Sequence, residues 1–329
     1  MTPLLKVTDL RTYYRTFGGR RVVKAVDGVS FTLEAGATLG LVGESGCGKT
    51  TTCHSIVRLL PKGSEIVSGS IEFDGVDLTK LSQDEMQKIR GKEIGMILQD
   101  PMASLNPLFS IYDQVSEPAY YHRGIKGRPL QERVTSLLQS VRIPSPKVRM
   151  KEFPHMMSGG MRQRIVGAIA LSGGPRLIIA DEPTTNLDVT IQAQYLDLLR
   201  DLQQNTGVAL IFVTHDLGII AKMCDEVIVM YAGKAVEQGP VREIFTNPKH
   251  PYTEALLASI PKMGSKDPLV AIEGAPPDLA SLPPGCPFAP RCKYKDQHGK
   301  YDIDPPDFVV GEDHKVKCWL HEGVVAHGR

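Results

Sequence analysis

The run GESGCGKTT, from Gly43 to Thr51, follows the apolar stretch Thr38 to Val42 and precedes an uncharged segment of helical character. A strand before the run and a helix after it are the context in which such a glycine-rich loop binds phosphate. The glycines let the backbone curl so that successive N–H groups point at a phosphate, and the helix beginning near Lys49 adds the positive end of its dipole. The run therefore predicts a loop that binds a nucleoside triphosphate.

Several side chains of this loop have distinct expected roles. Lys49 supplies a positive charge for the terminal phosphates, and the Thr50 hydroxyl is placed to ligate a Mg2+ ion that bridges them. Cys47 has two interpretations: its thiol has a pKa lowered by Lys49, or it is an inert residue at a tolerant position. The predicted nucleotide-binding residues of the loop are Gly43, Glu44, Ser45, Gly46, Cys47, Gly48, Lys49, Thr50 and Thr51.

Length and composition exclude several classes of protein. The chain has 329 residues, 42% of them hydrophobic, which is enough for a main domain with a core and a smaller appendage. Lys and Arg number 38 against 37 Asp and Glu, and this balance argues against a nucleic-acid binder. Apolar runs such as Ala209 to Val213 are far shorter than a membrane crossing needs. No secretory signal is visible, so we expect a cytoplasmic chain.

Strand-like and helix-like segments alternate in the second half of the chain, which predicts an α/β fold with a parallel sheet. These segments are the strand-like runs Leu177 to Ala180, Ala209 to Val213 and Val227 to Met230 and the helical runs Ile191 to Gln204 and Leu217 to Met223. A stretch at about residues 103–172 is mostly helical in period. Beyond Pro261, prolines and cysteines accumulate. We therefore expect a main domain at 1–262 with a helical subdomain at about 103–172, and a small Cys/Pro-rich C-terminal module at 263–329.

Polar residues that follow apolar strands are candidates for chemistry. Asp181 would hold Mg2+ through water and Glu182 would orient or deprotonate the attacking water, unless the two acids only begin the next helix. Gln99 can reach a metal or a water through its carbonyl oxygen, and the alternative is a solvated side chain. His215 could donate to the γ-phosphate or be a helix-start histidine without a role.

Together with SGG at Ser158 to Gly160 and with Asp188, these residues stand in an order that resembles the ATP-binding-cassette (ABC) ATPases. The resemblance runs through nearly all of residues 1–262. It implies the P-loop ABC ATPase fold, with a mixed sheet core and a helical subdomain. It makes Glu182 the catalytic carboxylate and His215 the switch residue, and it places Gln99 in the loop that senses Mg2+ and couples to a membrane partner.

The resemblance also implies that one chain lacks a complete ATP site. The signature residues Ser158, Gly159, Gly160 and Met161 would act on ATP held by a second ATPase subunit, and Asp188 would lie in the loop between the two subunits. Tyr14 resembles the aromatic residue that stacks on adenine, with Tyr13 as a near rival.

Three further stretches resemble the oligopeptide and dipeptide importer branch of this family: Ile97 to Pro107, Asp181 to Gln194 and Ile244 to Pro261. The resemblance implies an ATPase that uses ATP and Mg2+ at the cytoplasmic face of the membrane to energise import of di- or oligopeptides. The implied partners are two membrane permeases, a second homologous ATPase subunit in a heterodimer and an extracytoplasmic solute-binding protein, with no nucleic acid. Alternatives are nickel or oligosaccharide as cargo, or a soluble cassette ATPase outside transport, which a single cassette without coiled coils disfavours.

The tail motif GCPFAPRC, Gly285 to Cys292, and the later Cys318 resemble the cysteine-bearing tail of the same branch. In relatives such a tail can hold a 4Fe-4S cluster on four thiolates. This sequence has Cys286, Cys292 and Cys318, and His298 stands near the place of the missing cysteine, as an imidazole ligand for an iron–sulfur cluster. Zinc on the same set, or no metal at all, are the alternatives.

Overall fold

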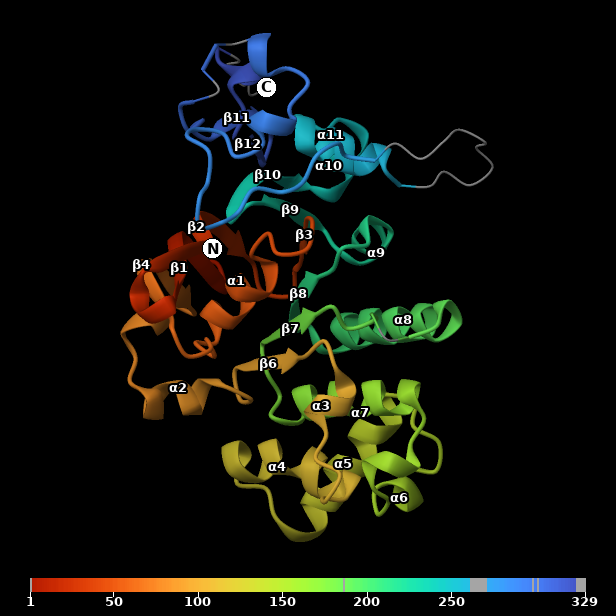
Figure 1. The fold of residues 1–329 in the computed structure, drawn as a ribbon. Helices are drawn as coiled ribbons and strands as arrows, with labels where there is room; N and C mark the ends of the chain where they lie inside the picture. The colour runs from red at the N-terminus through yellow and green to blue at the C-terminus, as the bar shows by residue number, and fades with distance from the viewer. Residues whose placement is uncertain (1, 186, 261–270, 298, 301, 324–329) are drawn as a thin grey trace. The chain divides into compact units, whose positions relative to one another are not determined.

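The computed structural model describes residues 2–185, 187–260, 271–297, 299–300 and 302–323. The chain divides into two compact units. The first unit consists of Met1–Thr32, Leu39–Thr79 and Thr214–Arg329, and the second of Leu33–Thr38 and Lys80–Val213. Figure 1 draws the elements of both units in the colours of the chain.

The first unit begins with an antiparallel sheet in the strand order β2-β1-β4-β5. Its strands are β1 (Leu5–Thr16), β2 (Arg21–Leu33), β4 (Ser64–Phe73) and β5 (Val76–Asp77). Strand β1 pairs with β4 from Leu5 opposite Phe73 to Tyr14 opposite Ser64. This register puts Leu5 and Val7 in the core, while the far end of β1 carries Tyr13 and Tyr14.

Five more strands of the first unit lie in the order β11-β12-β10-β9-β3. They are β3 (Thr38–Val42), β9 (Glu226–Tyr231), β10 (Lys234–Pro240), β11 (Phe308–Gly311) and β12 (His314–Val316). Strands β3 and β9 are parallel, and the other neighbours are antiparallel, so the sheet is mixed. The helices of this unit are α1 (Lys49–Ile56), α9 (Leu217–Met223), α10 (Val241–Thr246) and α11 (Pro251–Ala258).

The second unit has three parallel strands in the order β8-β7-β6. They are β6 (Ile94–Ile97), β7 (Leu177–Asp181) and β8 (Ala209–Val213), and every residue of β7 and β8 is buried. Burial on both faces explains why these strands are continuous apolar runs without alternation. The helices are α2 (Gln83–Ile89), α3 (Pro101–Ser104), α4 (Ile111–Arg123), α5 (Gly127–Ser140), α6 (Pro146–Arg149), α7 (Gly159–Ser172) and α8 (Val189–Thr206). Figure 1 shows α3 to α7 grouped together.

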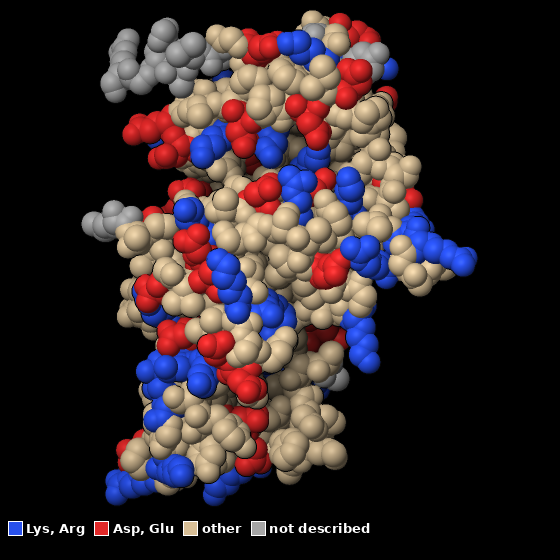
Figure 2. All heavy atoms as spheres, turned by 90° about the vertical axis from the view of Figure 1, so that its left-hand side faces the viewer, with Lys and Arg blue, Asp and Glu red and all other residues tan. Residues whose placement is uncertain are grey.

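The α/β prediction is confirmed, and several predicted elements match the observed bounds. Strands β3 and β8 and helix α9 have the predicted limits. The strands β11 and β12 were not predicted: they are only four and three residues long, and β12 pairs with β10, which lies far away in the chain. In the part of the chain that the structure describes, no helix combines the length and the apolar character of a membrane span. Figure 2 shows Lys and Arg interspersed with Asp and Glu over the face that it draws.

A buried carboxylate joins the C-terminal segment, defined as the described residues between 271 and 323, to the rest of the first unit. Glu237 on β10 is 2% exposed and accepts hydrogen bonds from the backbone N–H groups of Lys249 (2.6 Å) and His250 (2.9 Å). Its carboxylate also lies 2.8 Å from Nε2 of His314 on β12. Burial by itself would raise the pKa of Glu237, but these hydrogen bonds outweigh it and hold the pKa below its ordinary value.

We expect Glu237→Gln to lower the free energy of unfolding at pH 7 by about 2–3 kcal/mol, because a buried charged acceptor of several hydrogen bonds is lost. The folded-state pKa of Glu237 is depressed, so this contribution is present above a pH of about 4.5 and is lost as the pH falls through the folded value. Urea unfolding at pH 7 and pH 4 should therefore show a smaller difference between variant and wild type at pH 4. Equal stability at pH 7, with exposed Glu243→Gln as the control, would contradict this account.

Candidate functional site

The glycine-rich loop runs from the end of β3 into α1, and its shape requires glycine at two positions. Gly43 and Gly48 have φ angles of +148° and +106°, which side chains rarely tolerate. A Cβ atom at Gly43 would also clash with the Met230 carbonyl, and one at Gly48 with the Ala25 carbonyl. The loop thus packs directly on the backbone of β9 and β2, which fixes its curve.

The predicted phosphate-binding lysine lies inside this loop. Lys49 is 5% exposed, and its Nζ donates to the carbonyl oxygens of Gly43 (2.8 Å) and Glu44 (3.1 Å). Ser45 and Thr50 are exposed. The arrangement holds a positive charge within the curl, and phosphate oxygens can take the place of the two carbonyls as its partners.

The interpretation of Cys47 as a thiol with a lowered pKa is wrong. Cys47 is 4% exposed, and burial raises the pKa of its thiol despite the Lys49 ammonium, whose Nζ lies 3.7 Å from the sulfur. The free-energy cost of burying a thiolate away from water is larger here than the stabilisation that the Lys49 charge gives it. The thiol therefore stays protonated, as in the alternative of an inert loop residue.

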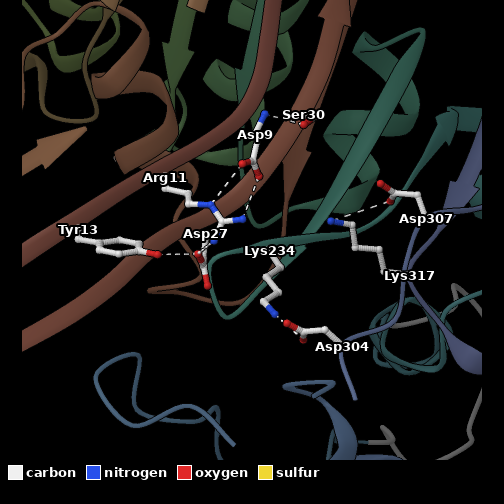
Figure 3. Close-up of polar contacts among 9 residues, drawn as sticks. All are labelled: Asp9, Arg11, Tyr13, Asp27, Ser30, Lys234, Asp304, Asp307 and Lys317. Atoms are coloured by element: carbon white, nitrogen blue, oxygen red, sulfur yellow. Dashed lines mark hydrogen bonds and ion pairs between the residues drawn. The ribbon is translucent and has the colours of Figure 1, made fainter. Parts of the chain in front are cut away.

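The structure separates the two tyrosines that the sequence left as rivals. Tyr14 Oη lies 3.0 Å from the Thr51 hydroxyl of helix α1. Tyr13 instead donates to Asp27 at 2.7 Å, in a polar cluster that includes Arg11 (Figure 3). Only Tyr14 is thus attached to the helix that follows the loop.

His215, the predicted switch residue, is also in the first unit. It is exposed and comes directly before Asp216. The carboxylate of Asp216 accepts from the N–H groups of Gly218 and Ile219 and so caps α9. The cap fixes the residue at which α9 begins. It therefore also fixes the backbone position of His215, which comes directly before the cap.

The second unit brings Gln99 and Glu182 together. Glu182 follows β7 with φ of +44°, a strained backbone of the kind found at functional sites. One of its carboxylate oxygens accepts from Gln99 Nε2 (3.0 Å) and from the Thr185 hydroxyl (3.0 Å). Asp181, the last residue of β7, is 3% exposed. The unit thus presents a carboxylate held by two neutral donors at the carboxyl end of a parallel strand.

The predicted signature residues form the N-terminus of α7. Ser158 caps the helix, its hydroxyl accepting from the Met161 N–H at 3.3 Å, and Gly159 and Gly160 make the first turn. A Cβ at Gly160 would lie 2.8 Å from a methyl group of Ile191, so this glycine lets α7 approach α8 closely. Ser158 and Gly159 are exposed. An exposed helix N-terminus of this kind favours an anion.

Asp188 caps the neighbouring helix α8. Its carboxylate accepts from the N–H groups of Thr190 (3.1 Å) and Ile191 (3.0 Å). The side chain is exposed, so capping and a contact with a second subunit are compatible.

Cys286, Cys292 and Cys318 line one small cavity, which His250 and Trp319 also border. Burial raises the pKa of each thiol, that of Cys318 to about 12. The described residues contain no group of three ligand side chains positioned for one metal ion, and His298 lies outside them. The thiols therefore share a site but do not form a ready metal centre.

Sequence reasoning missed the partner of the loop residue Glu44. Arg291 donates from Nη1 and Nη2 to the two Glu44 carboxylate oxygens at 2.8 and 3.2 Å. The only signal in the sequence is an arginine within GCPFAPRC, and nothing local points from it to a residue 247 positions earlier.

Comparisons with known proteins agree with this geometry. The profile of the ABC transporter family matches residues 26–185, and that of the oligopeptide/dipeptide transporter C-terminal region matches residues 236–298. The oligopeptide transport ATP-binding protein OppD of Bacillus subtilis (strain 168) is 50% identical over 323 residues, 97% of this chain and 89% of that protein. The dipeptide transport ATP-binding protein DppD of the same organism is 47% identical over 335 residues, covering 99% of this chain and 97% of that protein.

A solved structure supports the same assignment. The dimeric post-hydrolysis state of the ATP-binding cassette MJ0796, bound to ADP and Pi, matches with a TM-score of 0.65 at 26% identity, over 72% of this chain and 99% of that one. The chain therefore belongs to the ABC transporter ATPases, and within them to the oligopeptide/dipeptide transporter branch. As an ABC ATPase, it uses ATP and Mg2+.

Proposed function

We propose that this chain is the ATP-hydrolysing subunit of a membrane importer for di- or oligopeptides. The observation that carries the proposal is that one chain has both features: the glycine-rich loop with Lys49 inside it, and a Glu182 carboxylate that accepts a hydrogen bond from Gln99. The peptide cargo is supported by the similarity to OppD and DppD over nearly the whole chain. The test is ATP hydrolysis by the complex purified with its permeases: peptide-loaded solute-binding protein should stimulate it, and indifference to peptide would refute the cargo.

Catalysis in this proposal is positioning and charge neutralisation. The loop amides and Lys49 bind the β- and γ-phosphates, and Tyr14 stacks on adenine. Thr50 and Gln99 would hold Mg2+, Asp181 would hold it through water, and the ion would neutralise phosphate charge. Glu182 accepts the proton of the attacking water, and His215 binds the γ-phosphate.

A second ATPase subunit completes the site. The signature turn at Ser158 to Met161 is an exposed helix N-terminus. In this proposal it binds the γ-phosphate held by the other subunit. Asp188 lies at the same contact. We favour a homologous, non-identical second subunit. Mixed complexes in which one subunit carries Ser158→Arg should lose hydrolysis at the partner's loop, and unchanged hydrolysis there would exclude this role.

The permease contact is proposed for the helical part of the second unit. An open groove of about 680 Å3 there is lined by Phe109, Tyr120 and Tyr121 among other residues. Phe109 and Tyr121 are 52% and 73% exposed, as is unusual for large aromatic residues. The chain accordingly binds the cytoplasmic face of the membrane as a peripheral subunit.

Tyr121→Ala is expected to weaken association with the permeases about tenfold, because large aromatic residues carry much of the energy of a docking contact. ATP affinity of the free chain should stay unchanged. Val148→Ser, which removes another exposed apolar side chain outside the groove, is the control. Permease pull-down by the two variants to equal extents would place the contact elsewhere.

The metal proposal concerns the cavity of Cys286, Cys292 and Cys318, with His298 as the fourth residue. It is supported by the shared cavity and not by ligand geometry, and metal binding would have to displace three thiol protons. Iron, zinc and acid-labile sulfide content of protein purified without oxygen decides among an iron–sulfur cluster, a zinc site and no metal.

A further inference from the structure

The carboxylate of the loop residue Glu44 is held by an arginine of the C-terminal segment. The Arg291 side chain is only 5% exposed and that of Glu44 is 26% exposed, so the bidentate pair is largely removed from water. The rest of the guanidinium is also bound: Nε donates to the Glu273 carbonyl at 2.8 Å, and Nη1 lies 3.2 Å from the Tyr231 hydroxyl. A guanidinium group with this many hydrogen-bond partners is held in a single orientation.

The loop backbone at Glu44 is attached to the same structure. The Glu44 N–H donates to the hydroxyl of Tyr252, which is buried. The Tyr252 ring packs against Tyr231 and against Phe288 of the C-terminal segment, with ring centroids 4.6 and 5.4 Å away. Both the backbone and the side chain of Glu44 therefore rest on a cluster that includes residues 288 and 291.

Two other ion pairs of the C-terminal segment, one with β10 and one within the segment, differ in kind. Figure 3 shows Lys234 paired with Asp304 and Lys317 paired with Asp307. Both aspartates are more than half exposed, and neither pair includes a loop residue. Such pairs contribute little and do not reach the phosphate-binding loop. Arg291 is distinct because its partner lies within that loop.

From these contacts we propose that Arg291 is a positioning residue for ATP binding: through Glu44 it holds the phosphate-binding loop in its receptive shape and neutralises a carboxylate beside the phosphates. The C-terminal segment thereby sets the affinity of the chain for ATP. The inference rests on the proposed role of the loop and adds to it a residue that lies outside the loop and acts through Glu44. Without Arg291, an unpaired carboxylate would repel the triphosphate, and the loop would lose one of its two attachments at Glu44.

The test is a double-substitution cycle that measures ATP affinity of the full-length chain. Arg291→Ala should raise the Kd for ATP about tenfold, and Arg291→Lys should raise it less because the charge remains without the fork. Glu44→Gln removes the repelling charge, so adding Arg291→Ala to Glu44→Gln should have little further effect. In the assembled complex, the same loss should appear in KM with kcat within about twofold.

Three comparisons make the result decisive. Lys234→Met breaks an ion pair of the C-terminal segment away from the loop and should leave the Kd for ATP unchanged. Lys49→Ala reports on the loop itself: if it does not weaken ATP binding, the proposed function fails rather than this inference. Where Arg291→Ala does not fold, Arg291→Lys and Glu44→Gln complete the cycle. Wild-type affinity in folded Arg291 variants, or equal effects of Arg291 substitution with Glu44 and with Gln at position 44, would overturn the proposal.

Discussion

Glu182→Gln is expected to leave ATP affinity near the wild-type value and to lower ATP hydrolysis by the assembled complex about 10²–10⁴-fold. The substitution preserves the shape of a side chain whose oxygen accepts from Gln99 and Thr185 at 3.0 Å each. An amide cannot take up the proton of the attacking water at neutral pH. The loss should therefore fall on kcat, with the complex accumulating in its ATP-bound form.

Single-turnover hydrolysis together with equilibrium ATP binding separates these effects. Glu132→Gln, an exposed glutamate on α5 in the same unit, is the matched control and should behave as wild type. Near-normal turnover by Glu182→Gln would mean that another group activates the water. A large loss of ATP affinity would instead mean that the carboxylate is structural.

Lys49→Ala should weaken ATP binding by roughly 10- to 150-fold, since charged hydrogen bonds to phosphate are lost. Lys49 is buried, and its Nζ donates to the carbonyl oxygens of Gly43 and Glu44. Its positive charge therefore lies inside the loop. The alanine variant also leaves those carbonyls without their donor.

Fluorescent-nucleotide titration of the free chain measures this effect. Lys62→Ala, which removes an exposed lysine shortly after α1, controls for net charge. Similar ATP affinities for Lys49→Ala and Lys62→Ala would show that the loop does not bind the phosphates as proposed.

Features that depend on local sequence were predictable. The run Gly43 to Thr51 specifies its own curl through glycines at positive φ, and the strand Thr38 to Val42 before it is a wholly buried apolar run. Strand β8 was predicted to the residue for the same reason. In both cases burial on two faces leaves an uninterrupted hydrophobic signal.

Features that depend on distant partners were not predictable. Strand β1 runs from Leu5 to Thr16, and its polar half has no apolar pattern because pairing with β4 holds it in place. The pKa of Cys47 depends on burial, which the adjacent Lys49 charge does not reveal. The pair of Arg291 with Glu44 joins two motifs at opposite ends of the chain, and each motif looks complete without the other.

The central claim, that this chain drives peptide import by hydrolysing ATP, is tested most directly by uptake of a labelled peptide into proteoliposomes. The vesicles should contain the permeases with this chain, either wild type or Glu182→Gln, and should be supplied with the solute-binding protein outside and ATP inside. We predict ATP-dependent accumulation with the wild-type chain and none above background with Glu182→Gln. Equal accumulation with both chains, or none with the wild type while ATP is hydrolysed, would contradict the account.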